Sequence, residues 1–386
     1  MLVQRAPRQR AGFTLTEVLI AIFVMAIGMI SLFVLFPFGA LKMMQAIKDD
    51  KCAYAADNAH VHAVLFWKNV WTIYDAGTHE PRQRTYDQAK QYEQALQALD
   101  DPNDTAASYT GDSSKLTGFT PPFTRSTPAT NPEILNPFAA SYPLYIDPIG
   151  WESYRASGLP AGRDWIGGQG GTGAPYRQIP RRTLWAFNPF YTPMGETPLL
   201  PALRVPAITR ATSLIDDIGF TTKGNATDPS TGFVERGNKY SWSYIIRREQ
   251  YASPHEVHLT VLVFQDRNAS SPAREEVWQA TFSEGSTFVS VNTGGGRPFI
   301  RKGGFIMDAS RYGTYQEAKF FRVANITEAN ATTWELELDR PWKNPLNPPV
   351  APAAGGIIYV FDTDTTGRLA EVFDRGLISP TCAPLP

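Results

Sequence analysis

An uncharged, strongly apolar segment near the start constrains this chain more than any other feature. Between Val18 and Phe36 the apolar run is interrupted only by the hydroxyl group of Ser31. A helix of roughly nineteen residues is about 28 Å long, which is close to the ~30 Å thickness of a bilayer's hydrocarbon core. The segment therefore predicts a single membrane-spanning helix.

The residues in front of this helix predict its orientation. Residues 1–12 contain Arg5, Arg8 and Arg10 and no acidic residue. The positive-inside rule keeps such a leader in the cytoplasm, so the bulk of the chain is expected on the opposite side of the membrane.

Three interpretations of this region compete. It could be a plain membrane anchor, or a secretory signal peptide cut near residues 38–40. The apolar part is longer than the ~7–15 residues usual in signal peptides, and a signal peptide gives no reason for the carboxylate of Glu17 at its front edge. The third interpretation depends on the residues from Gly12 to Glu17.

The third interpretation rests on a spaced set of residues. Gly12 is followed by Phe13, then by Thr14-Leu15-Thr16-Glu17, and then by the apolar helix. This pattern resembles the N-terminus of type IV pilins and type II secretion pseudopilins. The resemblance implies that a prepilin peptidase cuts between Gly12 and Phe13 and methylates the new amine of Phe13. It also implies other pilin or pseudopilin subunits and an inner-membrane assembly machinery as partners, besides membrane lipid.

Glu17 has a physical reason to be present in such a helix. A carboxylate in a membrane costs about 2.5–3.5 kcal/mol at the centre of the bilayer and less near its edge, so it needs a partner. The Phe13 amine of a neighbouring subunit, shifted along a filament axis, could neutralise it and fix the axial register. The alternative is that Glu17 merely reaches the membrane interface.

Composition favours a folded, strand-rich domain beyond the helix. The 386 residues include 30 glycines and 31 prolines, and 43% are hydrophobic. The net charge of −1 gives no indication of nucleic-acid binding.

The expected fold class is α+β and pilin-like: a long N-terminal transmembrane helix packed on a C-terminal antiparallel sheet, with large loop-rich insertions. The predicted divisions are a leader (1–12), a transmembrane and assembly helix (13–41), its periplasmic continuation (42–72), a loop-rich region (73–236), an antiparallel sheet region (237–379) and a Pro-rich tail (380–386).

Periodicity places the main elements. The helix is expected to continue past Pro37 with a bend. Beyond it, helical spacing predicts an inward face made of Met44, Ile47, Ala55, Ala59, His62, Leu65 and Phe66. From Tyr240 onward, alternation predicts a series of strands, beginning with a hairpin that places Tyr240, Trp242 and Tyr244 on one face and Ser241 and Ser243 on the other.

Few residues suggest chemistry. The two cysteines, Cys52 and Cys382, could form a disulfide on the oxidising side of the membrane. Asp362 and Asp364, two residues apart before Gly367, resemble the start of a calcium loop, but its closing Glu is absent. The sequence suggests no cofactor other than calcium, and a plain turn is the alternative interpretation of these residues. The segment Pro254–His258 has its histidines three residues apart in a predicted strand, which does not fit a zinc protease. No catalytic residues are predicted.

The sequence thus predicts a structural subunit, not an enzyme: a minor pilin or pseudopilin, anchored by one span in a bacterial inner membrane with its C-terminal domain in the periplasm, and later part of a pilus or pseudopilus. The alternative is a membrane-tethered envelope adhesin or binding protein that uses the helix only as an anchor.

Overall fold

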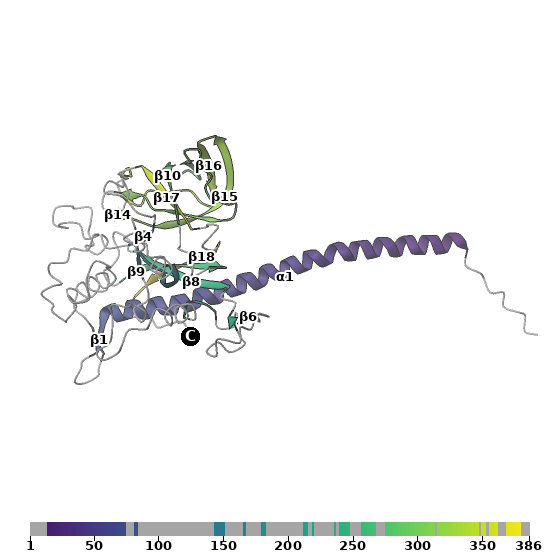
Figure 1. The fold of residues 1–386 in the computed structure, drawn as a ribbon, viewed down its shortest axis with the longest axis horizontal. Helices are drawn as coiled ribbons and strands as arrows, with labels where there is room; N and C mark the ends of the chain where they lie inside the picture. Colours follow the sequence, from purple (N-terminus) through teal and green to yellow (C-terminus); the bar gives the residue numbers. More distant parts are fainter. Residues whose placement is uncertain are drawn as a thin grey trace, which may run out of the picture. The chain divides into compact units, whose positions relative to one another are not determined.

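A computed structural model describes residues 14–74, 81–83, 143–150, 165–166, 179–182, 211–214, 218–219, 235–236, 239–247, 256–267, 275–312, 315–346, 349–352, 355–361 and 368–379. The chain divides into two compact units, residues 1–51 and 52–386. Its elements form an N-terminal helix followed by a predominantly antiparallel β region, so the predicted α+β class is confirmed (Figure 1).

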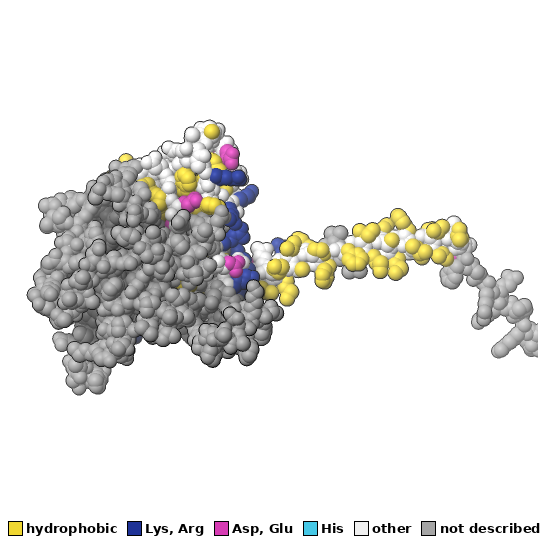
Figure 2. Space-filling view, in the orientation of Figure 1, with side chains coloured by type: hydrophobic (Ala, Val, Ile, Leu, Met, Phe, Trp, Pro, Cys, Tyr) yellow, Lys and Arg dark blue, Asp and Glu magenta, His cyan; other side chains and the backbone are white. Residues whose placement is uncertain are grey.

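Helix α1 (Leu15–Trp71) belongs to both units. It passes through Pro37 without ending, as expected, because a proline removes only one backbone hydrogen bond from a helix of this length. In the first unit the described apolar side chains of α1 are exposed, from Leu15 to Ile47, and Figure 2 shows them along this part of the helix. Within the described residues, no helix satisfies the length and hydropathy required of a membrane span.

In the second unit α1 packs on a sheet through small side chains. Ala55, Ala56, Ala59 and Ala63 are completely buried, and their spacing of three and four residues puts them on one helix face. Opposite them lie large aromatic side chains of the sheet, including Trp242 and Tyr244.

The predicted inward face was therefore only partly right. Ala55 and Ala59 are buried and Phe66 is partly buried, but Met44, Ile47 and Leu65 are exposed, and His62 keeps an exposed surface. Small residues of α1 line the contact because the aromatic side chains of the sheet already fill the space between helix and sheet. A large side chain on the helix would keep the two backbones apart.

The sheet on which α1 packs has six strands in the order β18-β9-β8-β3-β5-β4. Only the β3–β5 pair is parallel. Strand β8 lies within the sheet, and every one of its residues is buried, so both faces of the sheet are covered. The strands are β3 (Leu144–Ile146), β4 (Trp165–Ile166), β5 (Ile179–Arg182), β8 (Tyr240–Arg247), β9 (Val257–Gln265) and β18 (Arg368–Ile378).

The second face of this sheet is covered by a closed barrel of six antiparallel strands. Its order is β10-β11-β16-β15-β12-β17, and β17 pairs with β10 to close it. Gly356 begins β17, and a Cβ there would collide with the carbonyl oxygen of Ala280 on β10, so the closing pair needs glycine at this position. The strands are β10 (Glu276–Phe282), β11 (Phe288–Asn292), β12 (Phe305–Asp308), β15 (Lys319–Asn330), β16 (Thr333–Leu338) and β17 (Gly356–Val360).

Two apolar clusters hold the barrel. One fills its interior, with Val289, Ile306 and Leu336 fully buried. The other lies between barrel and sheet and joins Met307 and Tyr359 to residues of the sheet such as Leu262. The second unit is thus three layers: helix, sheet and barrel. Three further strand pairs are β1 (Thr72–Tyr74) with β2 (Pro81–Gln83), β6 (Ile218–Gly219) with β7 (Glu235–Arg236), and β13 (Arg311–Tyr312) with β14 (Tyr315–Gln316).

The barrel departs from the predicted architecture. Residues 237–379 were expected to form one antiparallel sheet, but the structure divides their strands between the six-stranded sheet and the closed barrel. A closed barrel is not part of the classic pilin fold. The hairpin of β8 and β9 is confirmed, and so is the face that carries Tyr240, Trp242 and Tyr244.

Candidate functional site

The first turn of α1 holds the one predicted assembly residue that the structure describes. The carboxylate Oε2 of Glu17 accepts hydrogen bonds from the backbone N–H and the hydroxyl of Thr14, both at 3.0 Å. In return the backbone N–H of Glu17 lies 3.4 Å from the Thr14 hydroxyl. This reciprocal arrangement is a capping box, which satisfies N–H groups that otherwise lack partners at a helix start.

The capping box was readable from the sequence but was missed there. Thr14 and Glu17 stand three residues apart just before an apolar run, which is the signature of this motif. In this structure the Glu17 carboxylate is bonded to its own helix end. Its bond to a neighbouring subunit's Phe13 amine stays a prediction.

Downstream of Glu17, the described side chains of α1 form an exposed apolar surface. No charged residue occurs between Glu17 and Lys42. The described large side chains there are about half exposed or more, including Phe23 at 66%, Phe33 at 74% and Phe36 at 79%. Exposing apolar surface to water costs about 25 cal/mol of free energy per Å². We therefore expect lipid or protein to cover this segment.

The other predicted site residues are only partly placed. Gly12, Phe13, Cys382, Asp362 and Asp364 lie outside the described residues. Cys52 is buried in the contact between α1 and the sheet. Within the described ranges, no group of three or more His, Cys, Asp or Glu side chains could hold a metal ion. The disulfide and the calcium loop remain predictions.

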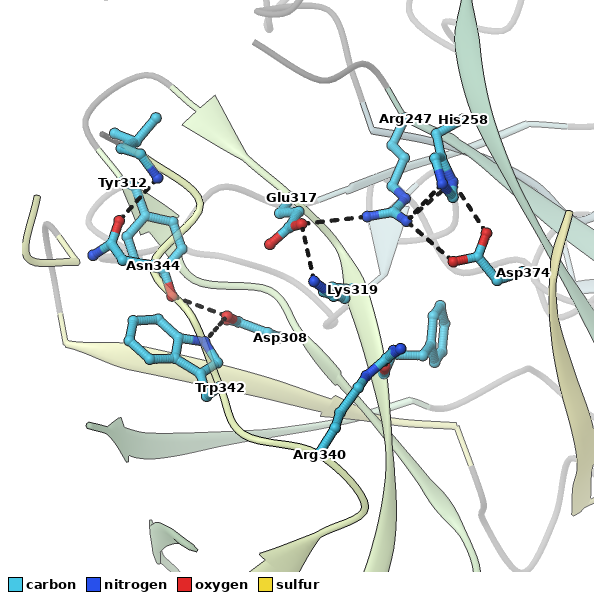
Figure 3. A network of polar contacts seen from close by, with 12 residues as sticks. Arg247, His258, Asp308, Tyr312, Glu317, Lys319, Arg340, Trp342, Asn344 and Asp374 are labelled. Atoms are coloured by element: carbon cyan, nitrogen blue, oxygen red, sulfur yellow. Dashed lines mark hydrogen bonds and ion pairs between the residues drawn. The ribbon is translucent and has the colours of Figure 1, made fainter. Parts of the chain in front are cut away.

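A second group of polar residues lies between the sheet and the barrel (Figure 3). The guanidinium of Arg247 on β8 lies 3.5 Å from a carboxylate oxygen of Glu317, in the segment between β14 and β15. It also lies 3.6 Å from a carboxylate oxygen of Asp374 on β18 and 3.0 Å from Nδ1 of His258 on β9. Arg247 is buried, and its charge is compensated by Glu317 next to the barrel and by Asp374 on the sheet. We call this group, which links the sheet to the barrel, the Arg247 network.

A third polar group lies inside the barrel. Asp308, at the end of β12, is buried, and its Oδ2 accepts hydrogen bonds from the Tyr312 hydroxyl and the Trp342 indole N–H, each at 2.9 Å. Burial raises the pKa of Asp308, and the donated hydrogen bonds lower it by less. These bonds satisfy a buried carboxyl group and fix the segment after β16 to the barrel.

The contact between α1 and the edge strand β18 is also polar. Arg375 on β18 donates a hydrogen bond of 2.7 Å to Asp57 on the helix. Burial and the charge of Arg375 lower the pKa of nearby His60, and Asp57 raises it by less. Burial lowers the pKa of His62, whose ring lies 5.0 Å from that of Trp242. The helix is thus fixed to both the face and the edge of the sheet.

Comparison with known protein families decides what the N-terminal segment is. Residues 7–33 match the family model of the prokaryotic N-terminal methylation motif. The chain carries a prepilin-type signal. This signal occurs in type IV pilins and pseudopilins, which are structural proteins, and the match includes Gly12, Phe13 and Glu17. Comparison with curated proteins and with solved structures found no significant match.

The capped start of α1 lies within the prepilin-type signal. The capping box stabilises the N-terminal end of the helix directly after the predicted cleavage point. The apolar surface that follows is long enough to serve as a packing surface for other helices.

Proposed function

We propose that the chain is a minor pilin or pseudopilin: a subunit that prepilin peptidase processes and that assembles through α1 into a type IV pilus or a type II secretion pseudopilus. The observation that carries this proposal is the match of residues 7–33 to the N-terminal methylation motif. The exposed apolar surface of α1 in the first unit supports it independently, since such a surface needs partners.

The apolar helix would act twice. Before assembly it anchors the chain in the bacterial inner membrane, with residues 1–12 in the cytoplasm and the β domains in the periplasm. The sequence supports this step, because the run from Val18 to Leu41 carries no charged side chain. After cleavage between Gly12 and Phe13 the same surface packs against the helices of other subunits.

Glu17 would change partners between these two stages. In the single chain its carboxylate is held by Thr14. In a filament, the methylated amine of Phe13 from a neighbouring subunit would take that carboxylate as its counter-ion. A charge pair in a low-dielectric core tolerates little misalignment, so it would select one axial register.

The size of the β region favours a minor subunit over the major one. Beside the sheet that covers α1, the chain carries a closed barrel of six strands. Such bulk is hard to repeat at every position of a tightly packed fibre, whereas a subunit at the tip or at occasional positions can accommodate it.

The state of the mature N-terminus tests this proposal. The chain is purified from cells with an active prepilin peptidase and, as the control, from cells without it. Mass spectrometry is expected to find N-methyl-phenylalanine at position 13 in the first sample and the uncut leader in the second. An intact Met1 in both samples, or a cut after Ala40, would contradict the proposal and favour a membrane-tethered binding protein.

A further inference from the structure

Four cationic side chains gather on the outside of the barrel. Arg301 and Lys302 stand in the turn before β12, Arg322 stands on β15, and Arg340 follows β16; all four are exposed. Nε of Arg322 donates a hydrogen bond of 3.2 Å to the carbonyl oxygen of Gly303, which joins β15 to the turn. We call these four residues the basic patch.

Arg340 is joined to the same place by strand pairing. The backbone N–H of Asp339 donates to the carbonyl oxygen of Arg322 at 2.9 Å, so the next residue, Arg340, emerges beside Arg322. Arg340 also donates a 2.6 Å hydrogen bond to the carbonyl oxygen of Phe320, and its guanidinium lies 5.3 Å from the ring of Phe321. The side chains of Arg322 and Arg340 are therefore held by the backbone of the barrel, which limits the conformational entropy that these two arginines lose on binding.

The positive charge of the patch is local. The carboxylates closest in strand order are Glu337 and Asp339 on and after β16, and Asp339 already accepts the backbone N–H of Arg322 at 3.1 Å. Four cations thus outnumber two carboxylates in a chain whose net charge is −1. An excess of this kind attracts anions, and guanidinium groups bind phosphate with two parallel hydrogen bonds.

The short connection between the apolar run and the second unit indicates the partner. Figure 2 shows Lys and Arg side chains gathered along one side of this unit. The uncharged run of α1 ends at Leu41 and the second unit begins at Cys52, so only residues 42–51 separate them. A helix of ten residues is about 15 Å long. The unit would then stay close to the surface of the membrane that anchors it.

We propose that the basic patch binds the anionic phosphate headgroups of that membrane. This inference rests on the proposed function, because it requires the helix to be anchored in the bilayer. Tethering raises the effective concentration of headgroups around the patch, so even weak individual contacts are populated. The contacts must break when the subunit leaves the bilayer for a filament, so the patch would retain unassembled subunits at the membrane.

The test compares full-length chain in lipid nanodiscs of pure phosphatidylcholine with chain in discs containing about one-third phosphatidylglycerol. The readout is acylation of the Lys302 amine by a water-soluble reagent, measured by mass spectrometry, with the exposed Lys68 on α1 as internal reference. Each cation near an anionic surface favours the bound state by roughly fivefold. Lys302 acylation is expected to fall several-fold on anionic discs only, and to recover in about 1 M salt, where the Debye length is about 3 Å.

A double charge reversal, Arg322→Glu with Arg340→Glu, is expected to abolish this protection. Arg368→Glu is the control for charge reversal outside the patch, because it reverses an exposed cation on β18, and it should leave the protection intact. Equal Lys302 acylation on both kinds of disc would overturn the proposal. Protection that depends on the number of chains per disc and not on lipid charge would also overturn it, in favour of a neighbouring subunit.

Entry of the chain into the discs is scored first, by co-elution of protein and lipid. Absence of co-elution contradicts the membrane anchoring of the proposed function and, with it, this inference. Co-elution with unprotected Lys302 contradicts the inference alone.

Discussion

At the scale of single residues, Glu17 has two possible roles that the structure allows to be separated. It caps its own helix through Thr14, and in the proposed filament it binds the amine of another subunit. Losing a cap costs about 0.5–2 kcal/mol and frays only the first turn. Losing the counter-ion of a buried amine would remove the register of the assembly.

Two variants discriminate between these roles. Glu17→Val is expected to leave cleavage and membrane insertion intact but to block assembly, because it removes the carboxylate. Thr14→Val, the matched control, removes only the hydroxyl group of the cap and should assemble, with faster amide hydrogen exchange in the first turn of α1. Assembly is measured by cross-linking in membranes and by recovery of sheared filaments. Normal assembly of Glu17→Val would contradict the register role, and equal loss in both variants would reduce Glu17 to a cap.

At the scale of elements, local patterns were readable and distant pairings were not. The prepilin-type spacing of Gly12, Phe13 and Glu17 lies within six consecutive residues, and strand alternation from Tyr240 is equally local. Closure of the barrel, in contrast, depends on Val277 of β10 pairing with Tyr359 of β17, far apart in the chain. The basic patch is hidden for the same reason, since strand pairing brings together its three segments.

The helix face was misjudged for a different physical reason. Periodicity reports which residues are apolar, but a sheet that presents Trp242 and Tyr244 selects small partners, so the buried face of α1 is made of alanines. Hydrophobic size was therefore a poor guide to burial at Met44, Ile47 and Leu65. The shape of the opposite surface decided the outcome, and no local pattern in the helix records that shape.

This close contact predicts strong sensitivity to added volume. Ala59→Leu inserts a large side chain where the alanine is completely buried, which is expected to cost about 1–3 kcal/mol of unfolding free energy. Ala53→Leu makes the same change at an exposed position of the same helix and should shift it by less than about 0.5 kcal/mol. Urea unfolding followed by tryptophan fluorescence measures both. Equal effects would show that α1 does not pack tightly on the sheet.

At the scale of the second unit, the question is what makes helix, sheet and barrel one body. An apolar cluster joins the barrel to the sheet through residues such as Met307, Tyr359 and Leu262. The Arg247 network crosses the same boundary. Its ion pairs and hydrogen bonds require defined geometries, whereas apolar packing does not. Arg247 should therefore contribute to the stability of the contact between the barrel and the sheet.

Arg247→Met tests this by replacing the cation with an apolar side chain of similar length. The side chain of Arg247 is 6% exposed, whereas those of Glu317 and Asp374 are 15% and 51% exposed. Breaking a fully buried pair costs about 3–5 kcal/mol, and the exposure of Asp374 reduces this, so a loss of about 1–3 kcal/mol is expected. Hydrogen exchange should accelerate first at the barrel–sheet boundary, around Glu317 and the start of β15, and later at Val289 and Val291 inside the barrel.

The control is Arg368→Met, which replaces an exposed arginine of the same sheet and should change neither the unfolding free energy nor the exchange rates. Unchanged stability in Arg247→Met would mean that apolar packing alone seats the barrel, and uniform acceleration throughout the barrel would mean that Arg247 supports the barrel's own fold.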